Sequence, residues 1–234
     1  QTHPVRLNTL TPSAPRRLIL ASSSPRRREL LGLTGLPFEL ATAHIDETPH
    51  PGEPAAAYTI RLSQSKAGAV ARATSGSALV LAADTTVADG DAILGKPADP
   101  GEARAMLRQL RGRTHQVYTA LTVIDTDSGE QITDLAVTDV PMRAYSDAEI
   151  EAYIASGDPF DKAGGYAIQN SGFRPVRLTD GCFANVVGLP LCHLLRTLRQ
   201  FGVQTAADVP RLCQEHHRYT CTVTQAILEE VPSA

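Results

Sequence analysis

One short apolar stretch limits the folds open to this chain, because it runs without interruption into an acidic residue. Residues 79–84 read Leu-Val-Leu-Ala-Ala-Asp. A run this short and this rich in Val and Leu is typical of a buried strand. Asp84 is therefore expected where that strand leaves the core, which is where open α/β sheets usually bind their ligands.

A cation follows twelve residues later. Lys96 lies between Gly95 and Pro97, which together form a turn signal. This spacing predicts a hairpin or tight return that directs the Lys96 ammonium back toward Asp84. The alternative is an acid that caps the next turn, with a solvated lysine beyond it.

The composition excludes several classes of protein. The chain has 234 residues, 42% of them hydrophobic and 20% charged, with a net charge of -3. One or two domains with a sizeable core are expected, and there is no overall basic field to attract nucleic acid or a membrane. No apolar run reaches the roughly 18 residues of a membrane helix, and the N-terminus lacks a signal-peptide core. A cytoplasmic protein is expected.

The start of the chain carries an anion-binding pattern. Residues 1–16 hold three prolines and no periodic pattern, which predicts a flexible leader. A short strand over 17–21 then leads into Ser24 and Pro25, a typical helix N-cap and first residue. Three arginines follow in the first turn, where the helix dipole already favours an anion. A phosphate chain would offset their charge; the alternative is a solvated basic turn.

Periodicity and turn signals outline an α/β chain. Strands are expected over residues 36–40, 79–87, 116–124, 130–145 and 174–185, and helices over 54–74, 99–112, 146–156 and 191–201. We expect one domain over 17–203 and a C-terminal extension over 204–234.

Two further stretches gather polar residues. Asp46 and Glu47 follow the second strand, and paired carboxylates there can hold a divalent cation, although loop acids are the commoner case. Residues 158–169 contain an acid, a base, two glycines and an amide: Asp161, Lys162, Gly164, Gly165 and Gln169. The glycines allow a ligand to approach the backbone closely.

Five motifs, taken in order, make the chain resemble the Maf family of nucleoside triphosphate pyrophosphatases. They are residues 22–27 (Ser-Ser-Ser-Pro-Arg-Arg), 83–85 (Ala-Asp-Thr), 95–97 (Gly-Lys-Pro), 161–164 (Asp-Lys-Ala-Gly) and 187–190 (Val-Gly-Leu-Pro). Each motif alone is weak, but five in family order are specific. The resemblance implies an α/β fold with a long twisted mixed sheet flanked by helices, in two lobes around a central cleft, similar to the inosine triphosphate pyrophosphatases.

The resemblance also implies an activity. It is the hydrolysis of a nucleoside triphosphate between its α- and β-phosphates, with Asp84 activating water. The matching substrate phosphate-binding positions are Ser24, Arg26, Arg27, Lys66, Lys96 and Lys162. Mg²⁺ or Mn²⁺ is implied as cofactor, with Glu47, Asp84 and Asp161 as candidate ligands. A homodimer is implied as well.

Three positions resemble the branch of the family that acts on dTTP and UTP. They are Arg26, Thr85 and Gln169. A glutamine amide can both donate to and accept from a pyrimidine edge. Two alternatives stay open: a pyrophosphatase for 7-methyl-GTP, and a non-catalytic nucleotide-binding regulator, because Maf proteins have been linked to septum formation and the arrest of cell division.

The C-terminal extension lies outside the resemblance. It contains Cys213, His216, His217 and Cys221, and Cys182 and Cys192 precede it. Such residues can bind zinc or form a redox disulfide, but the paired spacing of a zinc motif is missing. Small buried thiols beside surface histidines are the simplest interpretation.

Overall fold

A computed structural model describes residues 16–177 and 180–230 of the chain. The strands are β1 (Arg17–Ala21), β2 (Glu39–Ala41), β3 (Ala78–Asp89), β4 (Ala92–Leu94), β5 (Thr114–Asp125) and β6 (Gln131–Pro141). The α-helices are α1 (Pro25–Gly32), α2 (Ala55–Ala73), α3 (Pro100–Leu110), α4 (Asp147–Ala155), α5 (Phe183–Val187), α6 (Leu191–Gln200), α7 (Val209–His217) and α8 (Thr224–Glu229). Two 3₁₀ turns, η1 (Asp158–Asp161) and η2 (Ala163–Gly165), lie between α4 and α5.

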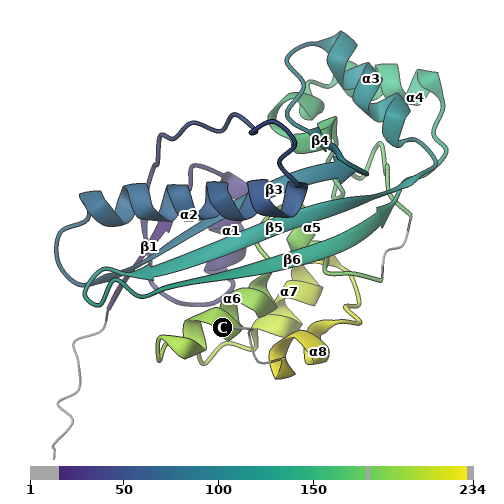
Figure 1. The fold of residues 1–234 in the computed structure, drawn as a ribbon. Helices are drawn as coiled ribbons and strands as arrows, with labels where there is room; N and C mark the ends of the chain where they lie inside the picture. The colour runs from purple at the N-terminus through teal and green to yellow at the C-terminus, as the bar shows by residue number, and fades with distance from the viewer. Residues whose placement is uncertain (1–15, 178–179, 231–234) are drawn as a thin grey trace, which may run out of the picture.

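The strands form one mixed sheet, which confirms the predicted fold class. Its order is β2-β1-β3-β5-β6, and β4 pairs with β3 outside this path. The β2–β1 and β1–β3 pairs are parallel, whereas β3–β5, β5–β6 and β3–β4 are antiparallel. Helix α2 covers one face, α1 and α6 lie on the other, and α3 and α4 lie beyond one end of the long strands (Figure 1).

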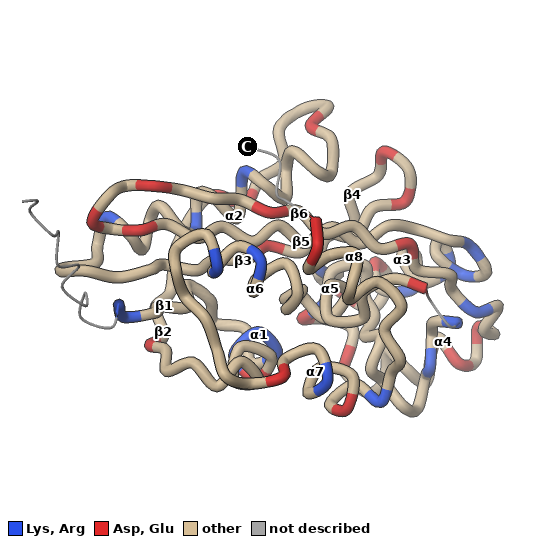
Figure 2. The backbone as a smooth tube through the Cα atoms, turned by 90° about the horizontal axis from the view of Figure 1, so that it is seen from below, with Lys and Arg blue, Asp and Glu red and all other residues tan. Residues whose placement is uncertain are grey.

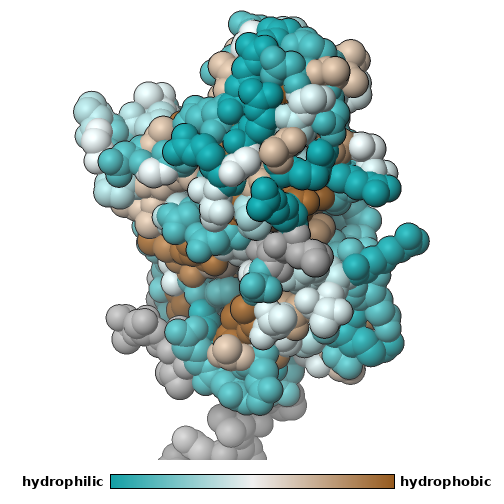
Figure 3. Space-filling model, turned by 90° about the vertical axis from the view of Figure 1, so that its right-hand side faces the viewer, coloured by the Kyte–Doolittle hydropathy of each residue, from teal (hydrophilic) through white to brown (hydrophobic). Residues whose placement is uncertain are grey.

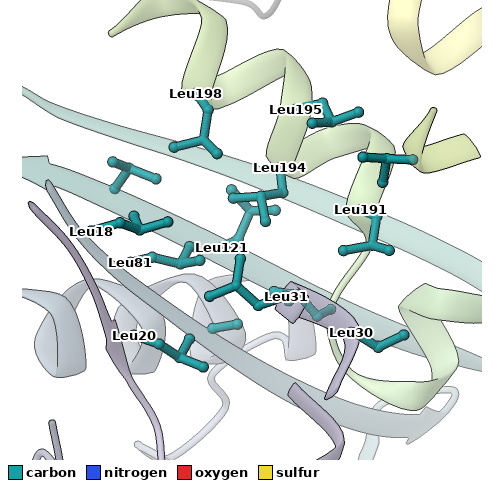
Figure 4. Packing of buried hydrophobic residues seen from close by; sticks show 14 of the residues in the cluster. Leu18, Leu20, Leu30, Leu31, Leu81, Leu121, Leu191, Leu194, Leu195 and Leu198 are labelled. Carbon is teal, nitrogen blue, oxygen red and sulfur yellow. The ribbon is translucent and has the colours of Figure 1, made fainter. Parts of the chain in front are cut away.

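Side chains along β3 alternate between the two faces, as expected of a strand. Leu79 and Leu81 belong to a cluster with the leucines of α6, seen in Figure 4. Val80 and Ala82 belong to a second cluster with residues of α2. By the same alternation, the side chains of Asp84 and Thr85, further along β3, point to opposite faces of the sheet.

Three predicted helix starts are confirmed by their caps. Ser24 Oγ accepts a hydrogen bond from Arg27 N at 3.4 Å, and Asp99 Oδ1 accepts one from Glu102 N at 2.9 Å. Ser146 forms a full capping box with Glu149. Each cap satisfies a backbone N–H that the helix itself leaves unpaired.

The strand predicted over residues 174–185 is wrong. In the described part of this segment, one isolated bridge joins Val176 to Met142, and α5 begins at Phe183. The reason lies in tertiary contacts: Asn185 Nδ2 donates to Val117 O at 3.0 Å and to Thr138 Oγ1 at 2.9 Å. These bonds hold the segment as a short helix across the sheet face, where alternation in sequence has no counterpart in the backbone.

The C-terminal extension packs against the core. Val209 is fully buried in the same cluster as α6, and Leu228 lies against that cluster. The four cysteines are free thiols, and they line a small cavity together with His217. Among the described residues, no three His, Cys, Asp or Glu side chains are grouped so that they could hold a metal ion. The leader predicted over 1–16 falls outside the described residues except for Arg16, which pairs with Asp125.

Acidic and basic residues are mixed along the chain (Figure 2), in line with the expectation that the protein has no overall basic field. Hydrophobic residues form small separate patches on the face seen in Figure 3. Among the described helices, none has the length and apolar character needed to cross a membrane.

Candidate active site

A cleft of about 520 Å³ opens beside the middle of β3. Strand β1 pairs with β3 as far as Leu81, and β4 pairs with it from Val87. Between these two pairings the edge of β3 has no neighbouring strand among those described. The β1–α1 turn, the end of β4 and the 3₁₀ turns surround this gap and complete the wall of the cleft.

Asp84 lies in the cleft on the face covered by α2. Lys66 Nζ of α2 donates to Asp84 Oδ1 at 2.5 Å and also pairs with Glu47 Oε1 at 2.9 Å. The side chains of Lys66 and Asp84 are 14% and 9% exposed, whereas that of Glu47 is 56% exposed. Asp84 Oδ2 has no hydrogen-bond partner in the described part of the chain, so it is available to a water molecule or a ligand.

The loop that carries Glu47 is fastened to α2. Tyr58 Oη donates to Glu47 O at 2.7 Å. Arg61 holds both oxygens of Glu53 at 2.7 Å and donates to Thr48 O at 3.1 Å. The hydrogen bond from Arg61 is the main reason that the pKa of the Glu53 carboxyl is lowered to about 2. These contacts fix the loop at Glu47 and on its C-terminal side.

The first turn of α1 contributes two arginines with different surroundings. Arg26 pairs with Asp161 of η1 at 3.0 Å. Arg27 points inward: its Nε donates to Gly188 O at 2.9 Å and its Nη2 donates to Thr85 Oγ1 at 3.0 Å. Burial lowers the pKa of the Arg27 guanidinium, and the negative charge of Asp84 opposes this shift.

The two remaining lysines differ in what they can still bind. Lys162 Nζ donates to Asp158 O, Asp158 Oδ1 and Asp161 Oδ1 at 2.6, 2.9 and 2.6 Å. An ammonium has three N–H donors, so Lys162 has none left for a ligand in this arrangement. Lys96, by contrast, lines the cleft without a hydrogen-bond or ion-pair partner among the described residues.

The structure brings the predicted site residues to one cavity. Its lining includes Ser24, Arg26, Arg27, Glu47, Lys66, Asp84, Thr85, Lys96, Asp161, Lys162 and Gln169. Five cationic side chains thus face three carboxylates. The three carboxylates do not form a single group, however, because Glu47 and Asp84 share Lys66 whereas Asp161 contacts Arg26 and Lys162.

Sequence reasoning missed several residues that support the site. Thr119 of β5 contacts Thr85 at 3.0 Å, and Asn185 and Arg61 hold neighbouring segments in place. The sequence gives a threonine in a strand no special signal. Only the β3–β5 register, which pairs Thr85 with Thr119, would have identified it.

The sequence of residues 17–201 matches the profile of the family described as Maf-like protein. This chain belongs to the Maf family. A Maf relative of Chromobacterium violaceum, named dTTP/UTP pyrophosphatase, is 47% identical over 192 residues, which cover 80% of this chain and 96% of that protein. Relatives of the same name in Myxococcus xanthus and Deinococcus radiodurans are 50% and 48% identical, each over 187 residues. These two matches cover 80% of the Maf chain described here and 93% and 94% of the relatives.

Solved structures include a more distant match to this Maf chain. A nucleoside-triphosphatase / dITP/XTP pyrophosphatase of Mycobacterium abscessus aligns with a TM-score of 0.41 at 16% identity, over 79% of this chain and 97% of its own.

Proposed function

We propose that this Maf family member hydrolyses dTTP and UTP to the nucleoside monophosphate and pyrophosphate. We base this on the Asp84–Lys66 pair, which lies in a cleft where most of the charged lining residues are cations. The names of relatives with 44–50% identity support the same substrates. A nucleotide-pool house-cleaning role follows from such an activity.

Asp84 is the proposed general base. Lys66 fixes Oδ1, so the free Oδ2 is directed to accept a proton from a water molecule. That water then attacks the α-phosphorus, the bond from this phosphorus to the α–β bridging oxygen breaks, and pyrophosphate leaves. A positioned base of this kind typically contributes about 10²- to 10⁴-fold to the rate.

The cations divide into those that contact phosphate and those that hold the site together. Arg26 and Lys96 have N–H groups to spare, and Ser24 opens the helix whose N-terminus faces the cleft. These groups are the proposed phosphate ligands, since charge on the transferred group must be neutralised. Arg27 and Lys162 are already bonded to protein atoms, so we assign them chiefly to positioning.

The carboxylates of Glu47 and Asp84 fit a hard divalent cation. Mg²⁺ is usually held by one or two protein carboxylates together with substrate phosphates and water, and these two side chains already converge on Lys66. Mg²⁺ or Mn²⁺ is the proposed cofactor; when bound, it would neutralise phosphate charge. Asp161 is less suited to the same ion, because it is engaged by Arg26 and Lys162.

Replacing Arg61 with alanine is expected to raise the Mg²⁺ concentration needed for half-maximal activity about tenfold. The reason is that residues which orient a metal ligand typically affect metal affinity by about 10- to 100-fold, and Arg61 fastens the loop that carries Glu47. Titration of activity with Mg²⁺ measures this shift. The matched control is Arg72→Ala on the same helix, and an equal shift there would contradict a loop-specific effect.

Nucleotide choice is assigned to three side chains around the cleft. Gln169 is exposed and lines the cavity, as do Thr85 and Arg26. The amide of Gln169 offers a donor and an acceptor to the edge of a pyrimidine.

The test is pyrophosphate release from dTTP, UTP, CTP, GTP and 7-methyl-GTP, with Mg²⁺ or Mn²⁺ and with a chelator. Pyrophosphate from dTTP and UTP alone, lost on chelation, is the expected result. Release from 7-methyl-GTP only would overturn the nucleotide assignment. Nucleotide binding without turnover of any substrate would favour a regulatory protein.

The proposal extends to assembly and location. A homodimer in the cytoplasm is the expected form of the protein. Light scattering coupled to size-exclusion chromatography gives the mass in solution, and a monomer at assay concentration would contradict the dimer.

A further inference from the structure

Thr85 and Thr119 face each other across the β3–β5 ladder. They are register partners, and their hydroxyl oxygens are 3.0 Å apart. Thr119 is fully buried, whereas Thr85 is partly exposed and lines the cleft. Two more groups complete a chain of hydrogen bonds: Arg27 Nη2 contacts Thr85 Oγ1 at 3.0 Å, and Thr119 Oγ1 contacts Asn185 O at 2.9 Å.

The direction of each hydrogen bond follows from counting protons. A backbone carbonyl only accepts, so the single hydroxyl proton of Thr119 points to Asn185 O. Thr119 must then accept the proton of Thr85, because two hydroxyl oxygens at 3.0 Å without a proton between them would repel. A guanidinium only donates, so Thr85 accepts from Arg27.

Thr85 is left with an acceptor and no donor. Its oxygen has two lone pairs, one of which is used by Arg27, and its proton is committed to Thr119. Thr85 lines the cleft, and the lack of a side chain at Gly188 leaves its hydroxyl oxygen uncrowded. A Cβ at Gly188 would lie 3.3 Å from Thr85 Oγ1, and Gly188 has a φ of +120°, which a side chain would rarely tolerate.

We propose that Thr119 is a specificity-positioning residue, which orients the Thr85 hydroxyl so that it accepts a hydrogen bond from the base. This role of Thr119 rests on the proposed function. It identifies the feature of the base that the site would recognise, which is a hydrogen-bond donor at N3. Uracil and thymine carry an N–H donor at N3, whereas cytosine carries an acceptor at the same atom. The oriented Thr85 oxygen accepts a hydrogen bond from N3–H of uracil or thymine. With cytosine, its lone pair would face the lone pair of N3, and the two would repel.

The test compares UTP with CTP in a set of threonine variants. Thr119→Val keeps the shape but removes the oxygen, which frees the Thr85 hydroxyl to rotate and donate to cytosine N3. The ratio of kcat/KM for UTP over CTP is expected to fall about tenfold, the size of one hydrogen bond made or left unmade. Thr119→Ser restores the ratio, because it keeps the hydroxyl. Thr119→Ala takes the place of Thr119→Val if thermal unfolding shows that the valine variant does not fold.

Two controls separate positioning from stability. Thr122→Val removes another fully buried hydroxyl of β5, on the face toward α2, and is expected to leave the UTP/CTP ratio unchanged. In the double variant Thr85→Val/Thr119→Val, the ratio is expected to equal that of Thr85→Val alone, since Thr119 acts only through Thr85. A further fall of the UTP/CTP ratio in the double variant would contradict the proposal that Thr119 acts through Thr85.

Binding of α,β-methylene UTP and CTP, measured by calorimetry, keeps this proposal distinct from the hydrolytic one. If the wild type prefers the UTP analogue and Thr119→Val loses that preference, the positioning role of Thr119 is supported even when no nucleotide is hydrolysed. An unchanged preference in a folded Thr119→Val protein, or equal binding of both analogues by the wild type, overturns it.

Discussion

Asp84→Asn is expected to lower kcat for dTTP and UTP about 10³-fold while nucleotide binding persists. Asparagine has nearly the same shape as aspartate, and its amide oxygen can still accept the hydrogen bond from Lys66. It cannot take up a proton at physiological pH, so the contribution of a general base, about 10²- to 10⁴-fold, is lost. Pyrophosphate release measures kcat, and calorimetry with a non-hydrolysable analogue measures binding.

The matched control is Asp89→Asn, the same substitution further along β3. Asp89 bonds Gln109 and Arg113 and does not line the cleft. Its substitution is expected to affect stability and to leave kcat within about threefold of the wild type, since it removes no group that is positioned for proton transfer. Full turnover by Asp84→Asn would defeat the assignment of the base, whatever the substrate.

Arg196→Ala is expected to lower the free energy of unfolding by about 3–5 kcal/mol, the usual cost of leaving a buried charge without its partner. Arg196 of α6 holds both oxygens of Asp134 of β6, at 2.7–3.0 Å, and the two side chains are 8% and 7% exposed. Arg196 also binds Ile227 O and Glu230 of the C-terminal segment. Denaturant unfolding of the wild type and the variant measures the loss.

Two comparisons test the cause of this loss. Arg199→Ala removes an exposed arginine from the same helix and is expected to change the free energy of unfolding by less than about 0.5 kcal/mol. The double variant Asp134→Leu/Arg196→Met replaces the pair with apolar side chains and is expected to recover most of the stability. A single-variant loss below about 1 kcal/mol would mean that the pair behaves as a surface ion pair.

The parts of the fold that were predictable are those encoded locally. Ser24, Asp99 and Ser146 mark helix starts because each cap is made within three residues along the chain. The apolar run before Asp84 was predictable because a strand buried on both faces needs apolar residues at every position. Residues 174–185 were not, because Asn185 takes its partners from β5 and β6, 68 and 47 positions away.

The residues that line the cleft were predictable as a set, but their contacts were not. The family resemblance assigned Lys66, Lys96 and Lys162 alike to phosphate binding. The structure separates them: Lys66 is paired with Asp84, Lys162 has all three donors engaged, and Lys96 has none engaged within the described chain. Such differences depend on which acceptors lie nearby in space, and spacing along the chain does not contain that information.

The opposite orientations of Asp84 and Thr85 on β3 have a consequence for how such proteins diversify. The two residues are joined by one peptide unit, yet each is braced by different helices: α2 supports Asp84 through Lys66, whereas α1 and α5 support Thr85 through Arg27 and Thr119. Substitutions at Thr119 can therefore alter the surroundings of Thr85 while the Lys66–Asp84 contact is kept. The proposed nucleotide choice can thus change separately from the proposed general base.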